Sequence, residues 1–214
     1  MLSNALMTGV SRSRWRGISL LLVIMVIAIL CWFIRTISDD PEIALAYGEP
    51  WEDMRKRSSA SIDPAIPNQI WFAIPDSDAR LRLVDPQYGF VTPVARFFTI
   101  GFINERVTNV RISPQTEPLL LDDALKIVLD LQDQWRQQGW FVSRPKSSPP
   151  FADTPQWRAQ LRNVNTRGRT YWQAGNKYKI MLLLGRFKDK KRPEEERYMI
   201  TLALSEPRDS SDED

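Results

Sequence analysis

The sequence predicts an α+β fold: a single N-terminal transmembrane helix, then an antiparallel sheet packed against one long helix and one short helix. Three observations predict it: an uncharged apolar run near the N-terminus, several short stretches rich in strand-forming residues, and two amphipathic segments of unequal length. Strands that are segregated from a few helices favour an α+β domain with an antiparallel sheet.

Composition places the chain among globular proteins and argues against nucleic-acid binding and histidine-dependent chemistry. Hydrophobic residues make up 43% and charged residues 26% of the 214 positions, which is typical of a globular chain. Of the 29 basic residues, four flank the apolar run; the other 25 stand against 26 acidic residues over Thr36–Asp214, a net charge of −1. The main part of the protein is therefore not expected to bind nucleic acid. The absence of histidine excludes His–carboxylate relays and histidine metal ligands.

The first expected element is the apolar run Gly17–Ile34, which contains no charged residue. A helix of that length spans roughly 27 Å, enough for the hydrocarbon core of a bilayer. Three arginines precede the run and acids follow it, so the positive-inside rule predicts that residues 1–16 are a basic cytoplasmic N-terminus. The run is too long for the apolar region of a signal peptide, so we expect an uncleaved anchor. The sequence thus predicts a single-pass inner-membrane protein, with residues 17–34 in the lipid bilayer and a periplasmic C-terminal domain.

Residues 35–69 are expected to form a linker between the anchor and the folded domain. They contain four prolines together with scattered charged and serine residues, a composition typical of a linker. The only cysteine, Cys31, lies within the apolar run, so the exported part is expected to fold without an intramolecular disulfide. A cysteine-free exported domain is more typical of a bacterial periplasm than of an animal secretory pathway.

Strands are expected next. Ile70–Ile74 is a short apolar run rich in strand-forming residues, and within Ala79–Leu83 apolar residues alternate with arginines, the pattern of a half-buried strand. Val94–Phe102 and Val107–Ile112 predict two further strands, joined by a hairpin around Asn104-Glu105.

The strongest helix prediction is Asp122–Gln138, whose apolar residues recur on one face. Asp122 is the expected N-cap, because its carboxylate can accept from first-turn N–H groups, and Gly139 is the expected stop. A strand over Trp140–Val142 follows. A shorter helix is expected to begin at Thr154, where a threonine cap precedes a proline.

The last expected strands are Thr170–Gln173, Lys177–Phe187 and Tyr198–Leu204, of which the first two form a second hairpin. In the third, alternate apolar residues are expected on one face: Tyr198, Ile200, Leu202 and Leu204. Within the middle strand, Ile180–Leu184 shows no alternation with polar residues, which predicts a central strand covered on both faces.

The folded α+β domain is therefore expected to span residues 70–205. Residues 206–214 carry five acids and one arginine, and we expect them to form a disordered acidic tail.

No motif for catalysis, cofactor binding or metal binding stands out. The sequence contains no glycine-rich phosphate loop, zinc-ligand spacing, nucleophile elbow or EF-hand loop. Two carboxylate pairs remain, Asp76 with Asp78 and Asp122 with Asp123, and a turn and a helix start account for them. We therefore expect no catalytic residue, cofactor or metal.

The second hairpin is the expected partner-binding surface, because exposed aromatic side chains beside arginines are typical of interface anchors. The basic run at its tip would lie near these rings if the last three strands pair in sequence order. The alternative is that both rings fill the two sides of the sheet and the basic run is a solvated tip. The predicted partner-binding residues are Arg169, Tyr171, Trp172, Lys188, Lys190, Lys191 and Arg192.

In outline, this architecture resembles bacterial envelope accessory proteins and toxin-neutralising immunity proteins. Our first hypothesis is a membrane-anchored periplasmic domain that binds a protein partner and has no catalytic activity. It would act as a subunit of an envelope complex or as an immunity-type inhibitor of a periplasmic toxin. One alternative is a carboxylate-dependent envelope enzyme, which predicts two carboxylates facing one cleft. The other is a lipid- or ligand-binding domain, which predicts a sizeable apolar pocket.

Overall fold

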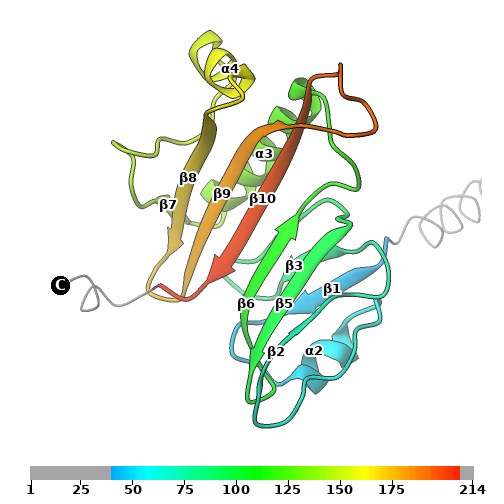
Figure 1. Cartoon of the computed structure of the whole chain (residues 1–214). Helices are drawn as coiled ribbons and strands as arrows, with labels where there is room; N and C mark the ends of the chain where they lie inside the picture. The colour runs from blue at the N-terminus through cyan, green and yellow to red at the C-terminus, as the bar shows by residue number, and fades with distance from the viewer. Residues whose placement is uncertain (1–39, 208–214) are drawn as a thin grey trace, which may run out of the picture. The chain divides into compact units, whose positions relative to one another are not determined.

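The computed structural model describes residues 40–207, which form a mixed α+β fold of three helices and two sheets (Figure 1). The smaller sheet has the strand order β1-β3-β4, from β1 (Glu42–Leu45), β3 (Arg80–Leu83) and β4 (Phe90–Val91). β1 pairs with β3 in parallel, whereas β3 pairs with β4 in an antiparallel fashion.

The larger sheet has seven strands in the order β2-β5-β6-β10-β9-β8-β7, and every neighbouring pair is antiparallel. Its strands are β2 (Ile70–Ala73), β5 (Phe97–Ile103), β6 (Arg106–Ser113), β7 (Phe141–Val142), β8 (Arg167–Ala174), β9 (Tyr178–Phe187) and β10 (Arg197–Ser205). The predicted hairpin between β5 and β6 is confirmed: Asn104 and Glu105 adopt φ angles of 50° and 62°, the left-handed region that tight hairpin turns require.

The helices are α2 (Trp51–Arg57), α3 (Leu121–Gln137) and α4 (Pro155–Arg162). The predicted Thr154 cap of α4 is confirmed, since its side-chain oxygen accepts from the backbone N–H of Trp157 at 3.3 Å. The predicted Asp122 cap of α3 is wrong. Leu120 occupies the cap position without a side-chain hydrogen bond, and Asp122 lies in the first turn, where it accepts from Arg158 at 2.6 Å.

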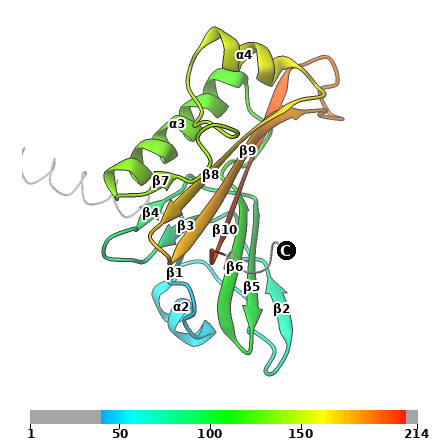
Figure 2. The same cartoon turned by 90° about the vertical axis from the view of Figure 1, so that its left-hand side faces the viewer.

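One face of the seven-stranded sheet packs on the core. Figure 2 shows α3, α4 and the three-stranded sheet on the same side of the large sheet. The alternate residues that β10 directs to this side are all buried, with Tyr198, Ile200 and Leu202 at 0% exposure, as the sequence pattern predicted. α3 covers them with its apolar face, in which Val128, Leu131 and Trp135 are also fully buried.

The structure corrects the predicted fold class and location. No helix within residues 40–207 is long and apolar enough to cross a membrane, and the fold has two sheets rather than one. The expected span at residues 17–34 and the basic segment 1–16 lie outside the described residues.

The structure also differs from the linker expected over residues 35–69. This stretch contributes β1 and α2, and Ile43, Leu45 and Met54 are fully buried in the core. The strand was missed because β1 has only four residues and obtains its partner from β3, about 35 residues further along the chain, through a parallel pairing. The folded unit therefore begins near residue 40 rather than residue 70.

Candidate functional site

The face of the seven-stranded sheet that points away from α3 is not covered by any described element (Figure 2). Side chains alternate across a strand, so this face, called the open sheet face below, is formed by every second residue of each strand. Nine large apolar side chains are exposed in the described part of the chain, and six of them lie on this one face. These six are Ile70, Phe72, Phe97, Ile103, Phe141 and Phe187.

The centre of the open sheet face is also apolar. Met181 and Leu183 of β9 and Met199 of β10 are only half-buried, because no layer covers them. The predicted cover on both faces of Ile180–Leu184 is therefore found on one face only. Ile180, Leu182 and Leu184 are at 0% exposure on the core side, whereas the two residues between them face outward.

Two adjoining hollows lie at the end of this face nearest the β9–β10 connection. Their volumes are about 410 and 210 Å³, and both are lined by Phe187 and Met199. Phe97 extends the apolar lining toward β5, and Leu183 extends it toward β8. In the smaller hollow the side chain of Arg167 lies against Gly185, where an added Cβ would stand 2.7 Å from the arginine Cγ.

Arg192 fixes the rim of the larger hollow. Its guanidinium donates to Asp189 Oδ2 and to Glu117 Oε2, both at 3.0 Å, and so ties the β9–β10 connection to the segment before α3. The backbone N–H of Lys191 and the Arg192 side chain hold the pKa of Asp189 below its ordinary value. Asp189 is thus stabilised as an ion, which does not suit it to donate a proton.

The structure separates the predicted partner-binding residues into three groups. Trp172 is in the core: its side chain is 1% exposed, its ring centroid is 5.5 Å from that of Trp135, and Arg136 lies over the ring at 5.4 Å. Its assignment as a partner contact is therefore wrong. Trp172 and Tyr171 are consecutive residues of β8, so their rings point to opposite sides of the sheet. Tyr171 lies on the open sheet face.

Tyr171 and Arg169 form the second group, on β8. Arg169 is exposed and donates to the Tyr171 hydroxyl at 3.3 Å, and the guanidinium of Arg144 lies 5.1 Å from the Tyr171 ring centroid. Tyr171 pairs with Met181, six residues along β9 from Phe187. That separation is roughly 20 Å at strand rise, so these residues do not adjoin the basic tip.

The basic tip is the third group. Lys191 and Arg192 line the larger hollow, and Lys188 and Lys190 are exposed beyond it. The predicted order of the last three strands is confirmed, because β8 pairs with β9 and β9 with β10. Sequence reasoning missed the apolar lining from Phe97, Phe187 and Met199. The alternation in β10 was a usable signal, since residues between the buried ones must face the other side.

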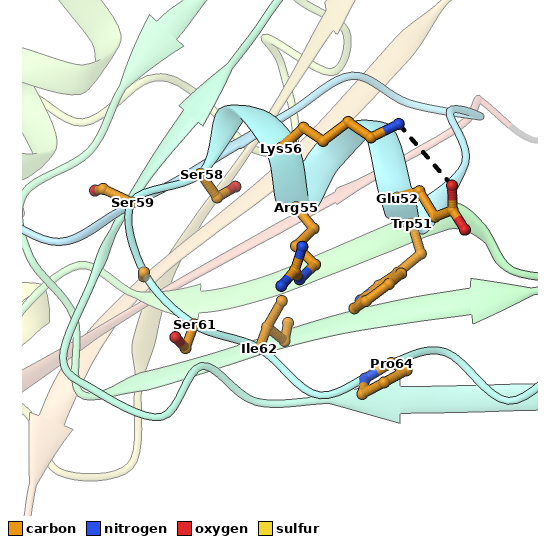
Figure 3. Close-up of a pocket in the computed structure, with 10 residues that line it drawn as sticks. Trp51, Glu52, Arg55, Lys56, Ser58, Ser59, Ser61, Ile62 and Pro64 are labelled. Atoms are coloured by element: carbon orange, nitrogen blue, oxygen red, sulfur yellow. Dashed lines mark ion pairs between the residues drawn. The ribbon is translucent and has the colours of Figure 1, made fainter.

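A third hollow, of about 790 Å³, lies between α2 and the segment that follows it (Figure 3). Its wall contains Trp51, with the guanidinium of Arg55 at 5.8 Å from the ring centroid. Ser58 Oγ accepts from Ala44 N and donates to Met54 O, whereas the buried indole Nε1 of Trp51 has no hydrogen-bond partner in the described part of the chain. One unpartnered indole N–H beside Arg55 and the Lys56–Glu52 ion pair does not by itself define a ligand.

One carboxylate of each candidate pair is ion-paired. Asp78 lies 3.1 Å from Arg96 Nη2, and Asp122 lies 2.6 Å from Arg158 Nη1. Within residues 40–207 no group of three or more acidic or cysteine side chains is placed to hold a metal ion.

Comparison of the chain with protein-family models, with curated proteins and with solved structures gives no match in any of the three. The assignment of a site therefore depends on the geometry of the open sheet face.

Proposed function

We propose that this protein is a protein-binding domain whose binding surface is the open sheet face. The observation that carries the proposal is the mismatch on β9. Its sequence is apolar on both sides, as in strands buried between two layers, yet the described part of the chain covers only one side. A partner that packs on Met181 and Leu183 would supply the second layer.

The distribution of apolar surface supports the same conclusion. Single exposed apolar residues are normal, but a contiguous apolar patch on a folded domain is typical of an interaction site. Here Phe97, Phe187 and Met199 line one hollow and Leu183 extends its lining, whereas Phe72 and Phe141 lie at the opposite edges of the same face. Methionine side chains adapt to irregular partners. The hollow lined by Phe187 and Met199 would accept an apolar side chain of the partner.

Two roles fit such a surface, a subunit of a larger complex and an inhibitor of one enzyme. A subunit co-purifies with several proteins, whereas an inhibitor binds one enzyme stoichiometrically and abolishes its activity. The carboxylate-enzyme alternative gains no support from the hollow, because Asp189 and Glu117 both bind Arg192 there.

The proposal is tested by covalent capture in cells. A photoreactive amino acid replaces Phe187 in the full chain, and irradiation is followed by denaturing purification and mass spectrometry. The matched control carries the same group at Val164, which is apolar and 64% exposed but does not belong to the open sheet face. We expect one discrete adduct from Phe187 and none from Val164. No adduct from Phe187, or the same adducts from both positions, would contradict the proposal.

A further inference from the structure

We propose that the acidic segment Glu206–Asp214 of this chain occupies the open sheet face in the absence of a partner and competes with the partner for it. The inference deepens the proposed function, on which its regulatory role rests. It commits to one occupant, a segment that follows β10 directly and that lies, from residue 208 onward, outside the described residues.

The open sheet face has a positive charge that no acid on the sheet balances. The seven strands contain no Asp or Glu at all. Apart from Arg106, which donates to the Gly48 carbonyl oxygen, four basic side chains stand on this face without an ion pair to any residue in the described part of the chain. They are Arg111 on β6, Arg167 and Arg169 on β8, and Lys179 on β9.

The charge of the segment complements that of the face. From residue 208 onward the segment carries four acids and one arginine, a net charge of −3 against the four cations. Two serines and two acids adjoin one another near its centre, with no bulky side chain to prevent close contact with the sheet.

The segment begins beside these cations. Ser205, the last residue of β10, pairs with Lys179, and Ala203 pairs with Arg111. Arg169 pairs with Leu183, four residues along β9 from Lys179, or roughly 13 Å at strand rise. Seven residues from 208 onward reach about 25 Å when extended, so all of these cations are within range.

Glu206 itself does not turn onto the face. Its carboxylate accepts from the Tyr47 hydroxyl at 3.4 Å, and burial together with this carboxylate raises the pKa of Tyr47. In this proposal the acids from Asp209 onward make the contact with the open sheet face.

A second copy of the chain is a poorer occupant. Two copies packed face to face would bring eight basic groups together without a balancing acid on either sheet, and like charges in contact oppose association. A short tether, in contrast, holds the acidic segment at an effective concentration in the millimolar range. Exposed ion pairs are individually weak and screened by salt, so a partner that also fills the apolar hollow would displace the segment.

The test measures where the segment lies in the full chain. A spin label is attached at Ser211→Cys in a Cys31→Ser background, and methionine methyl groups are observed by NMR. Met181 and Met199 report on the open sheet face, while Met54, which is 0% exposed in the core, is the internal control. A matched variant keeps the tether and the label but removes the charge through Asp209→Asn, Asp212→Asn, Glu213→Gln and Asp214→Asn.

We expect the label to broaden the Met181 signal at least about twofold more in the acidic segment than in the neutral one, and 0.5 M salt to abolish the difference. Equal broadening in the two variants would overturn the inference. If the proposed function itself is wrong, the result is a different one: the photoreactive group at Phe187 captures no partner, in the full chain and in the truncated chain alike. Truncation after Pro207 should also increase partner capture at Phe187, and unchanged capture would contradict the competitive role.

Discussion

Replacing Trp172 with Ala should destabilise the fold strongly, because the ring is a core element. The side chain is 1% exposed and contacts Trp135 and Arg136. A buried tryptophan removes 150–250 Å² from water, worth about 4–6 kcal/mol as an upper bound at 25 cal/mol per Å². The indole Nε1 has no hydrogen-bond partner, so no polar bond is lost. We therefore expect a loss of about 3–5 kcal/mol, the usual range for such truncations.

The assay is urea denaturation followed by far-UV circular dichroism, with thermal unfolding alongside it. For a domain of this size the melting temperature should fall by roughly 6–20 °C. The matched control is Tyr171→Ala, the neighbouring aromatic on the open sheet face, which should cost no more than about 1 kcal/mol. A loss below about 1 kcal/mol for Trp172→Ala would refute the placement of this ring in the core.

Two further predictions concern buried polar contacts. Gln132→Leu removes both hydrogen bonds that the fully buried Gln132 makes with the backbone of Phe151, so urea denaturation should show a loss of about 2–4 kcal/mol, and unchanged stability would contradict the contact. Burial raises the pKa of Glu42, but hydrogen bonds from Arg82 and Arg80 outweigh it, and the net pKa lies below the ordinary value of 4.5. Glu42 therefore contributes stability that is present above pH 4.5 and lost as the pH falls through the lower folded-state pKa. Glu42→Gln should flatten the loss of stability below pH 4.5, and an unchanged acid limb in pH-dependent denaturation would refute this.

The sequence was informative where a local pattern decides the structure. The amphipathic face of α3, the Thr154 cap of α4 and the alternation in β10 could all be predicted, because each depends on neighbours within a few residues. Charge and apolar periodicity also indicated an α+β domain with antiparallel pairing. These features come from propensity and pattern, which need no knowledge of distant partners.

What could not be predicted depends on distant contacts. β1 is a strand only because β3 pairs with it, and the proline-rich composition around it gave the opposite indication. The sequence could not decide whether Trp172 faces the core or the solvent, because that depends on which side of the sheet α3 covers. The apolar character of both sides of β9 was visible, but only the structure shows that one side has no cover. The candidate site could therefore be anticipated as a pattern, but not located.

The central claim is that the open sheet face binds a protein partner through its apolar hollow. The most direct measurement is the affinity of the partner captured at Phe187 for the intact chain, for Phe187→Ala and for Val164→Ala. Phe187 is 42% exposed and lines both hollows of this face, whereas Val164 lies outside it. We predict that Phe187→Ala weakens binding by about tenfold or more, or about 1.4 kcal/mol, and that Val164→Ala leaves it unchanged. Equal affinity of all three proteins would contradict the claim.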